Sequence, residues 1–190
     1  YLSHNQINHY QYLKDVLKAM QFIQGPKKWI LKSPQHLEQI TPLLATFPDA
    51  TFAITYRDPL SVVLSTATML SYGDRIRRYK VEPIHNFNYW NDRIKKLLTS
   101  FTENYELIPM NQKSDIYFHD LIRNNLNSVK SIYSKNSFEI DKIANNEIKK
   151  YINANKRGKH GQVIYNLEDF NVDKSEFYKS FKFYFDKFDI

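Results

Sequence analysis

Lys32 and Arg57 carry the clearest chemical signal, because each comes directly before a Ser or Asp and then a Pro. Ser and Asp favour the position before a helix, and Pro favours the first position inside it. Each cation also follows a short apolar run, residues 29–31 or 51–56, with the composition of a buried strand. Where parallel strands end at one sheet edge, such cations and the free amides of the following helices attract an oxyanion. The pair therefore predicts a phosphate or sulfate site, unless both cations only pair with surface carboxylates.

The spacing of apolar residues predicts helices that alternate with strands along the whole chain. Helical spacing covers residues 2–22, 35–47, 60–72, 83–107, 126–133, 141–153 and 174–188, and strand patterns cover residues 29–31, 51–56 and 115–118. Strands that alternate with helices indicate an α/β fold, in which helices cover both faces of a parallel sheet. No linker or internal repeat divides the chain, so we expect one domain over residues 1–190.

Composition limits the class of protein. Of 190 residues, 42% are hydrophobic and 25% are charged, which is typical of a folded domain rather than of a disordered or membrane-embedded chain. The absence of cysteine excludes a disulfide framework, a thiolate metal site and a cysteine nucleophile, and it fits a cytoplasmic location. No apolar run approaches the roughly 18 residues of a membrane span, and no signal peptide opens the chain.

The net charge favours an anionic partner. The chain has 27 basic and 20 acidic residues, a formal charge of +7, which suits nucleic acid, an acidic membrane surface or a phosphorylated small molecule. A nucleic-acid-binding domain could use the 14 Tyr and 13 Phe for base stacking. Because these aromatic residues follow the apolar faces of the predicted helices, we expect most of them in the core and no nucleic-acid partner.

Several sequence blocks, in order along the chain, resemble sulfotransferases that use 3′-phosphoadenosine 5′-phosphosulfate (PAPS), especially the bacterial-type branch. The blocks are Trp-Ile-Leu-Lys-Ser-Pro-Gln-His-Leu at 29–37, Phe-Pro-Asp-Ala-Thr-Phe at 47–52, Arg-Asp-Pro-Leu-Ser-Val-Val-Leu-Ser at 57–65, Ile-Tyr-Phe-His-Asp-Leu at 116–121, Asn-Lys-Arg-Gly-Lys-His-Gly at 155–161 and Tyr-Asn-Leu-Glu-Asp-Phe at 165–170. The resemblance implies a P-loop-type parallel sheet with a helix-rich C-terminal half.

One block of that family is missing. Nothing before Trp29 matches its glycine-containing phosphate loop, and the chain has only four glycines. The sequence therefore resembles the C-terminal two-thirds of a sulfotransferase, with a sheet that is incomplete at the N-terminus. We expect this fragment to associate with itself or to need an N-terminal segment, and to show no turnover alone. A non-catalytic nucleotide-binding remnant is the alternative function.

The resemblance also implies roles for individual residues. Arg57 and Ser65 would bind the 3′-phosphate of the donor, and Ser61, one turn earlier, would act as a helix N-cap or as a further donor. For Ser65 the alternative is a hydroxyl bonded back to its own helix. The family's basic loop over the same phosphate falls on Arg157, Gly158, Lys159 and His160, for which the alternative is a solvated charged loop.

Catalysis would move a sulfuryl group from PAPS to an acceptor hydroxyl or amine, with no metal required. Lys32 is the candidate for stabilising the charge that develops on the oxygens. His36 is the candidate base, because a helix N-terminus keeps its ring neutral; alternatively it binds a substrate or packs in the core, with the base elsewhere. We expect these two residues, Arg57, Ser65 and the loop 157–160 to meet in one cleft. The acceptor itself has no recognisable motif.

Overall fold

The computed structural model describes residues 4–135, 138–156, 158–159, 161, 165 and 167–190. Its sheet consists of two parallel strands, β1 (Phe52–Tyr56) and β2 (Lys113–Tyr117), in the part of the chain that is described. Phe52 pairs with Lys113, and Tyr56 pairs with Tyr117. This parallel register confirms the predicted α/β class and brings the carboxyl ends of both strands to one edge.

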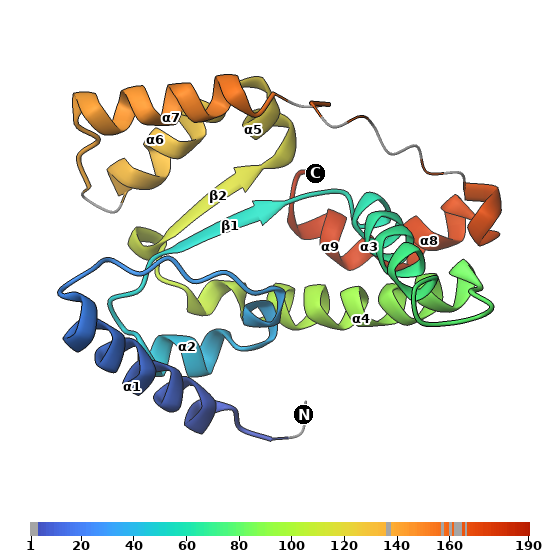
Figure 1. Cartoon of the computed structure of the whole chain (residues 1–190). Coiled ribbons are helices and arrows are strands. Elements are labelled where there is room, and N and C mark those ends of the chain that lie inside the picture. Colours follow the sequence, from blue (N-terminus) through green and yellow to red (C-terminus); the bar gives the residue numbers. More distant parts are fainter. Residues whose placement is uncertain (1–3, 136–137, 157, 160, 162–164, 166) are drawn as a thin grey trace.

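Helices make up most of the fold and lie on both sides of the sheet (Figure 1). They are α1 (Ile7–Gln24), the 3₁₀ helix η1 (Pro34–Glu38), α2 (Ile40–Thr46), α3 (Pro59–Asp74), α4 (Pro83–Asn104), η2 (Tyr105–Leu107), η3 (Met110–Gln112), α5 (Phe118–Arg123), α6 (Asn125–Lys135), α7 (Lys142–Ala154), η4 (Leu167–Phe170), α8 (Lys174–Ser180) and α9 (Lys182–Lys187). Among the described residues, none of these helices has both the length and the apolar content to cross a membrane.

Three predicted elements differ from the structure. The predicted strand at 29–31 is wrong, because that segment is extended but pairs with neither strand of the described sheet, and Ile30 is 88% exposed. The predicted helix at 35–47 divides at Gln39, whose φ of −127° leaves the helical region and separates η1 from α2. The predicted helix at 174–188 divides at Phe181 in the same way, into α8 and α9.

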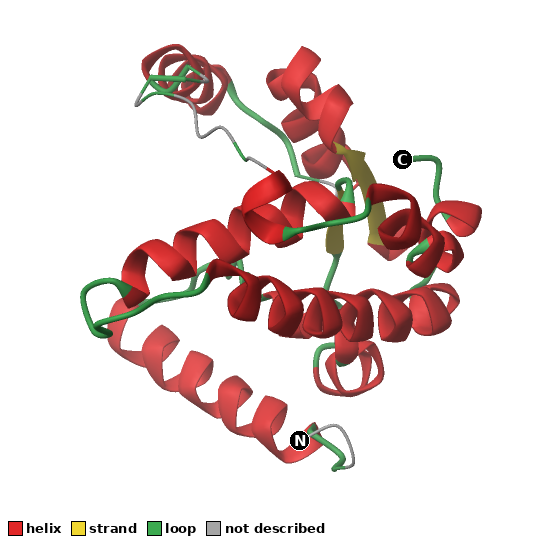
Figure 2. Ribbon diagram, turned by 90° about the vertical axis from the view of Figure 1, so that its right-hand side faces the viewer, coloured by secondary structure: helices red, strands yellow, loops and turns green. Residues whose placement is uncertain are grey.

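The core lies on the long helix α4. Near its start, Phe87 and Ile94 pack with α3 and with the aromatic residues of η4 and α8. Near its end, Phe101 packs under β1 with residues of α2 and α9. The two strands therefore lie among surrounding helices (Figure 2). Because buried aromatic side chains link α4 to the strands and to the C-terminal helices, the strand ends have a fixed support.

A hydrogen-bonded cluster holds the two strands together on the face toward α4. The hydroxyl of Tyr56 donates to Asp115 at 2.6 Å, and the hydroxyl of Tyr105 donates to the other oxygen of the same carboxylate at 2.9 Å. Burial and the neighbouring Asp115 raise the pKa of Tyr105 to about 12. Tyr117 stacks on Tyr56 with 5.0 Å between ring centroids. This cluster positions the residues that follow each strand.

Candidate active site

Arg57 and Phe118 meet where the two strands end. Arg57 follows β1, and Phe118 follows β2. The guanidinium carbon lies 4.6 Å from the centre of the Phe118 ring, and the Arg57 residue is half-buried. A guanidinium stacked on an aromatic face keeps its N–H groups directed outward in its own plane, where they can bind an anion. The structure thus places the positive charge of Arg57 at the edge of the sheet, where the sequence predicted it.

The start of α3 is already occupied by a carboxylate of the chain. Asp58 accepts hydrogen bonds from the amides of Leu60 and Ser61, at 3.1 and 3.2 Å, and from the Ser61 hydroxyl at 2.7 Å. Asp58 is therefore the N-cap, as its position before Pro59 predicted, but these amides are not free for an external anion. Ser61 serves the cap through its hydroxyl and does not act as the N-cap residue.

Ser65 lies one turn farther along α3 and is half-buried. The alternative of a hydroxyl bonded back to its helix is not found here, since no side-chain hydrogen bond joins Ser65 to another described residue. The neighbouring Thr66 does bond back in this way, to the carbonyl of Val62 at 2.9 Å. Ser65 therefore has a hydroxyl that can serve a ligand.

Two tyrosines of the C-terminal helices lie beside the turn between β1 and α3. Tyr184 of α9 is buried with its hydroxyl beside the backbone of Arg57, and burial raises the pKa of that hydroxyl. Burial and the charge of the neighbouring Asp58 carboxylate raise the pKa of Tyr178 in α8. Sequence reasoning placed these residues only on an apolar helix face. The structure adds that they lie beside the turn that carries Arg57.

His36 lies at the third position of η1 and is held by α1. A 2.9 Å hydrogen bond links its Nδ1 to the hydroxyl of Tyr10, which is buried, and the two rings lie 5.8 Å apart. Burial lowers the pKa of His36 below its ordinary value. Burial therefore favours the neutral form of the ring, and burial rather than the helix N-terminus is the cause that the structure shows.

A buried ion pair fixes η1 against α4. The guanidinium of Arg93 binds both oxygens of Glu38, whose side chain is only 2% exposed, while that of Arg93 is 20% exposed. Two parallel N–H···O bonds fix the orientation of the Glu38 carboxylate relative to the Arg93 guanidinium as well as the distance between them. Because Glu38 is two residues after His36, this pair and the Tyr10 bond together set the position of the imidazole.

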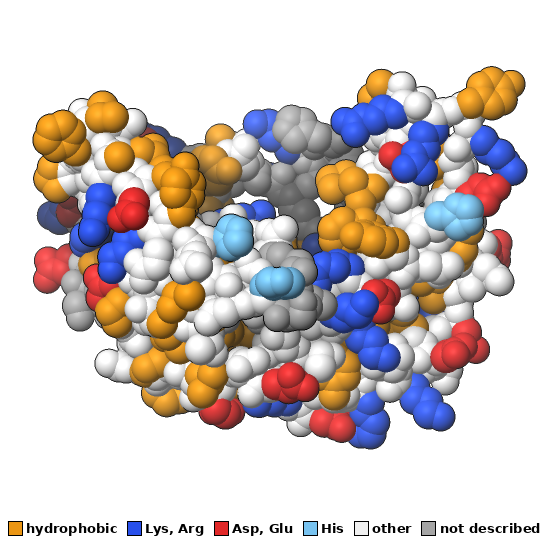
Figure 3. All heavy atoms as spheres, turned by 90° about the horizontal axis from the view of Figure 1, so that it is seen from below, with side chains coloured by type: hydrophobic (Ala, Val, Ile, Leu, Met, Phe, Trp, Pro, Cys, Tyr) orange, Lys and Arg blue, Asp and Glu red, His pale blue; other side chains and the backbone are white. Residues whose placement is uncertain are grey.

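A pocket of about 530 Å³ opens beside His36. One wall comes from the start of α1 and the residues before it, namely His4, Gln6, His9 and Tyr10. The other wall comes from Ser33, Gln35 and His36. Histidine side chains are exposed on this side of the molecule (Figure 3). In the described parts of the chain, however, no group of three or more His, Cys, Asp or Glu residues could hold a metal ion.

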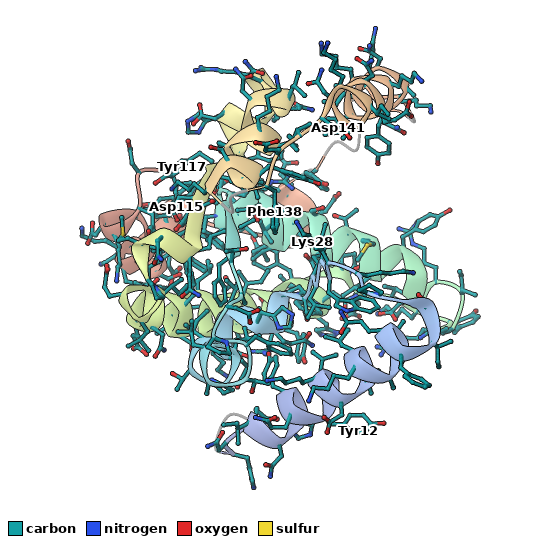
Figure 4. All side chains as sticks on the ribbon, turned by 90° about the vertical axis from the view of Figure 1, so that its left-hand side faces the viewer. Tyr12, Lys28, Asp115, Tyr117, Phe138 and Asp141 are labelled. Carbon is teal, nitrogen blue, oxygen red and sulfur yellow. The ribbon has the colours of Figure 1, made fainter. Side chains whose placement is uncertain are left out.

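Lys32 lies four residues before His36, at the surface. It follows an extended segment rather than a strand, and Ser33 does not cap η1, because its hydroxyl donates to the side chain of Gln35. The segment is held at Lys28, whose ammonium lies 3.4 Å from the centre of the Phe138 ring (Figure 4). The predicted meeting of Lys32 and His36 with Arg57 in one cleft remains a prediction.

The predicted basic loop follows α7. Gly158 and Lys159 are exposed, and Gly158 has a φ of +81°, a left-handed backbone conformation that glycine adopts without strain. Arg157 and His160 lie outside the described residues. The role of this loop over a phosphate stays a prediction.

Comparison with known proteins identifies the family. Residues 3–141 match the model of a family described as the sulfotransferase family. The fold resembles the crystal structure of sulfotransferase STF9 from Mycobacterium avium, with a TM-score of 0.85 and 19% identity, over 99% of this chain and 48% of that chain. It also resembles sulfotransferase STF1 from Mycobacterium tuberculosis, with a TM-score of 0.76 and 20% identity, over 95% of this chain and 46% of that one. No match was found among curated proteins. The chain spans about half the length of both solved structures.

Proposed function

Because the chain belongs to the sulfotransferase family, we propose that it transfers a sulfuryl group from PAPS to an acceptor hydroxyl or amine. The family supports sulfuryl transfer in general, and the donor and the acceptor are the proposal. The observation that carries it is the Arg57 guanidinium, half-buried and stacked on Phe118 at the carboxyl edge of the parallel strands. Open α/β sheets bind their ligands at this edge.

The donor's 3′-phosphate fits Arg57 and Ser65. A guanidinium can bind a phosphate through two parallel hydrogen bonds, and the Ser65 hydroxyl, without a described partner, can donate a third. The nearby Asp58 carboxylate would repel an anion, but its charge is taken up by two backbone amides and the Ser61 hydroxyl. Phosphate binding at this edge thus depends on side chains rather than on the α3 amides. Arg157, Gly158, Lys159 and His160 complete the proposed phosphate site.

The chemical step moves one group and one proton. The acceptor oxygen or nitrogen forms a bond to sulfur, the bond from sulfur to the bridging phosphate oxygen breaks, and the acceptor proton passes to His36. The lowered pKa of His36 favours the neutral ring, which is the form that can accept a proton. Lys32 offers a positive charge to the leaving oxygen. The products are a sulfated acceptor and 3′-phosphoadenosine 5′-phosphate (PAP).

Calorimetric titration with PAP tests the donor site without requiring turnover. We expect PAP to bind and Arg57→Ala to weaken binding by about 2–4 kcal/mol, because charged hydrogen bonds to the phosphate are lost. Adenosine 5′-phosphate, which lacks the 3′-phosphate, should bind the unmodified chain about as weakly as PAP binds the variant. Arg77→Ala removes an exposed guanidinium elsewhere and is the matched control, with no change expected. Equal binding of the two nucleotides by the unmodified chain would contradict the assignment.

A transfer assay separates the proposal from a non-catalytic role. A chain that binds PAP and also sulfates an acceptor is a transferase. Because we expect no turnover from this chain alone, binding without transfer indicates a nucleotide-binding remnant only if it persists after an N-terminal segment with a phosphate loop is added. We place the protein in the cytoplasm as part of this proposal, on the ground of its cysteine-free composition.

A further inference from the structure

The turn between α3 and α4 combines exposed apolar side chains with a run of cations. Four large apolar residues of this stretch are each at least 66% exposed, namely Met69, Tyr72, Ile76 and Tyr79. From Arg75 to Lys80 the sequence is Arg-Ile-Arg-Arg-Tyr-Lys, with four cations, no acid and every residue exposed. The turn lies at the right-hand end of the molecule in Figure 1. We propose that this surface, residues 69–80, binds the anionic headgroups of a membrane.

The apolar side chains of this surface belong to one side of α3. Met69, Tyr72 and Ile76 follow the spacing i, i+3 and i+7, which places residues on one face of a helix. Although α3 ends at Asp74, the amide of Arg78 bonds to the Asp74 carbonyl at 2.8 Å, an i to i+4 bond that continues the helical turn. The three apolar side chains therefore face the same way, with the cations beside them.

The start of α4 holds the turn in place. The side-chain amide of Asn86 donates to the Ser71 hydroxyl at 3.0 Å and to the Asp74 carboxylate at 3.2 Å. Ser71 is buried, and α3 packs along α4 over the buried Phe87. The surface is therefore formed before it meets a partner, which lowers the entropy cost of binding.

Two arginines of the surface keep their charge for a partner. The acids on either side of the run pair with Arg78 and Lys80, at 3.8 and 2.7 Å. Within the described parts of the chain, no ion pair or hydrogen bond engages the side chain of Arg75 or Arg77. A Lys or Arg close to an anionic bilayer strengthens binding about fivefold, so this charge favours a surface of phosphate-bearing headgroups.

Aliphatic side chains beside arginines favour a membrane over nucleic acid. Met69 and Ile76 gain free energy when they leave water for the acyl boundary of a bilayer. Nucleic acid offers phosphates and base faces, and stacking on a base needs an aromatic ring. Tyrosine suits the headgroup level, and an arginine stem can lie along apolar groups while its guanidinium stays in water. The surface thus matches the successive layers of an anionic bilayer.

Vesicle flotation tests the proposal on the unmodified chain, and aggregated protein sinks in this assay. Vesicles of phosphatidylcholine with about 30% phosphatidylserine should bind the chain about tenfold or more tightly than vesicles of phosphatidylcholine alone. Raising the salt from about 0.1 M to about 1 M should weaken that binding by about tenfold or more, because it shortens the screening length. Equal binding to both kinds of vesicle, no binding to either, or tighter binding to a short DNA duplex overturns the proposal.

A pair of charge variants locates the contact. Arg75→Gln with Arg77→Gln removes two unpaired cations and should weaken binding to the anionic vesicles about 25-fold. The control is Lys142→Gln with Lys149→Gln, which removes the same charge from exposed positions of α7, at the opposite end of Figure 1. It should weaken binding less than about threefold, because charges beyond the screening length contribute little. Equal losses in variant and control would refute the surface.

A pair of apolar variants tests insertion. Ile76→Ser with Tyr79→Ser should weaken vesicle binding about tenfold or more, because less apolar area leaves water. The control is Ile143→Ser with Tyr12→Ser, at positions 75% and 72% exposed on other helices, and no change is expected. A loss in the control as large as in the variant refutes the surface. The proposal does not depend on the donor site, since Arg57→Ala should leave vesicle binding unchanged.

Discussion

The ion pair between Arg93 and Glu38 should contribute more to stability than any exposed pair of the fold. Its carboxylate is 98% shielded from solvent, so removing the guanidinium leaves a buried charge without a partner. Breaking a buried pair from one side costs about 3–5 kcal/mol. Because the Arg93 side chain is itself 20% exposed and water can reach that end, we expect Arg93→Met to lower the free energy of unfolding by about 3 kcal/mol.

The measurement is urea unfolding followed by circular dichroism. The slope of the unfolding free energy against urea concentration should be the same in the variant and the unmodified chain. The control is Lys96→Ala, which breaks a 2.7 Å pair with Asp92 whose side chains are 52% and 64% exposed, and it should cost less than about 0.5 kcal/mol. Glu38→Gln combined with Arg93→Met should recover part of the loss, because the buried charge is gone. A loss below about 1 kcal/mol in Arg93→Met, or one equal to that of the control, would refute the reasoning.

The remaining predictions concern pH, the donor and association. Because the pKa of His36 is lowered in the folded state, the unfolded chain takes up the proton first as pH falls below the ordinary value of 6.5, and stability is lost. Unfolding measured from pH 7 to pH 5 should show this loss. The His36→Asn variant should lose less stability over the same range. An equal pH dependence in both proteins would contradict the burial of the ring. Ser65→Ala should weaken PAP binding about three- to tenfold in calorimetry, whereas Thr66→Ala, whose hydroxyl is used within the helix, should not; equal effects would remove Ser65 from the site. Ile30→Lys should reduce self-association in sedimentation experiments, because it places a charge on an 88% exposed apolar side chain, and an unchanged mass distribution would exclude this surface.

Local sequence patterns were sufficient to predict those elements whose structure depends on residues close together in the chain. The strand at β1, the long apolar face of α4 and the Asp58-Pro59 start of α3 are as predicted, because strand composition, helical spacing and capping act within a few residues. The family was identified for the same reason, since its blocks are short and contiguous. The match over residues 3–141 confirms that resemblance.

The strand predicted at residues 29–31 shows the limit of such signals. Its composition suits a strand, but strand pairing needs the backbone groups of another segment, and no neighbour in the described sheet supplies them. The prediction of free amides at the start of α3 is also wrong, because the Asp58 side chain accepts their hydrogen bonds. Both outcomes depend on competition for hydrogen bonds, which composition alone does not reveal.

The sequence by itself determined the residue types of the candidate site, the strand edge that presents Arg57, and the family. Tertiary structure alone decided what surrounds those residues: Phe118 under the guanidinium, Tyr10 on the imidazole, and Arg93 on Glu38, 55 positions away in the chain. These partners come from segments far apart in sequence, and strand pairing, the packing of α1 on α2 and the packing of η1 on α4 bring them together. Spacing along the chain carries information about one helix or strand at a time, whereas burial and pairing are properties of surfaces that only the folded chain possesses.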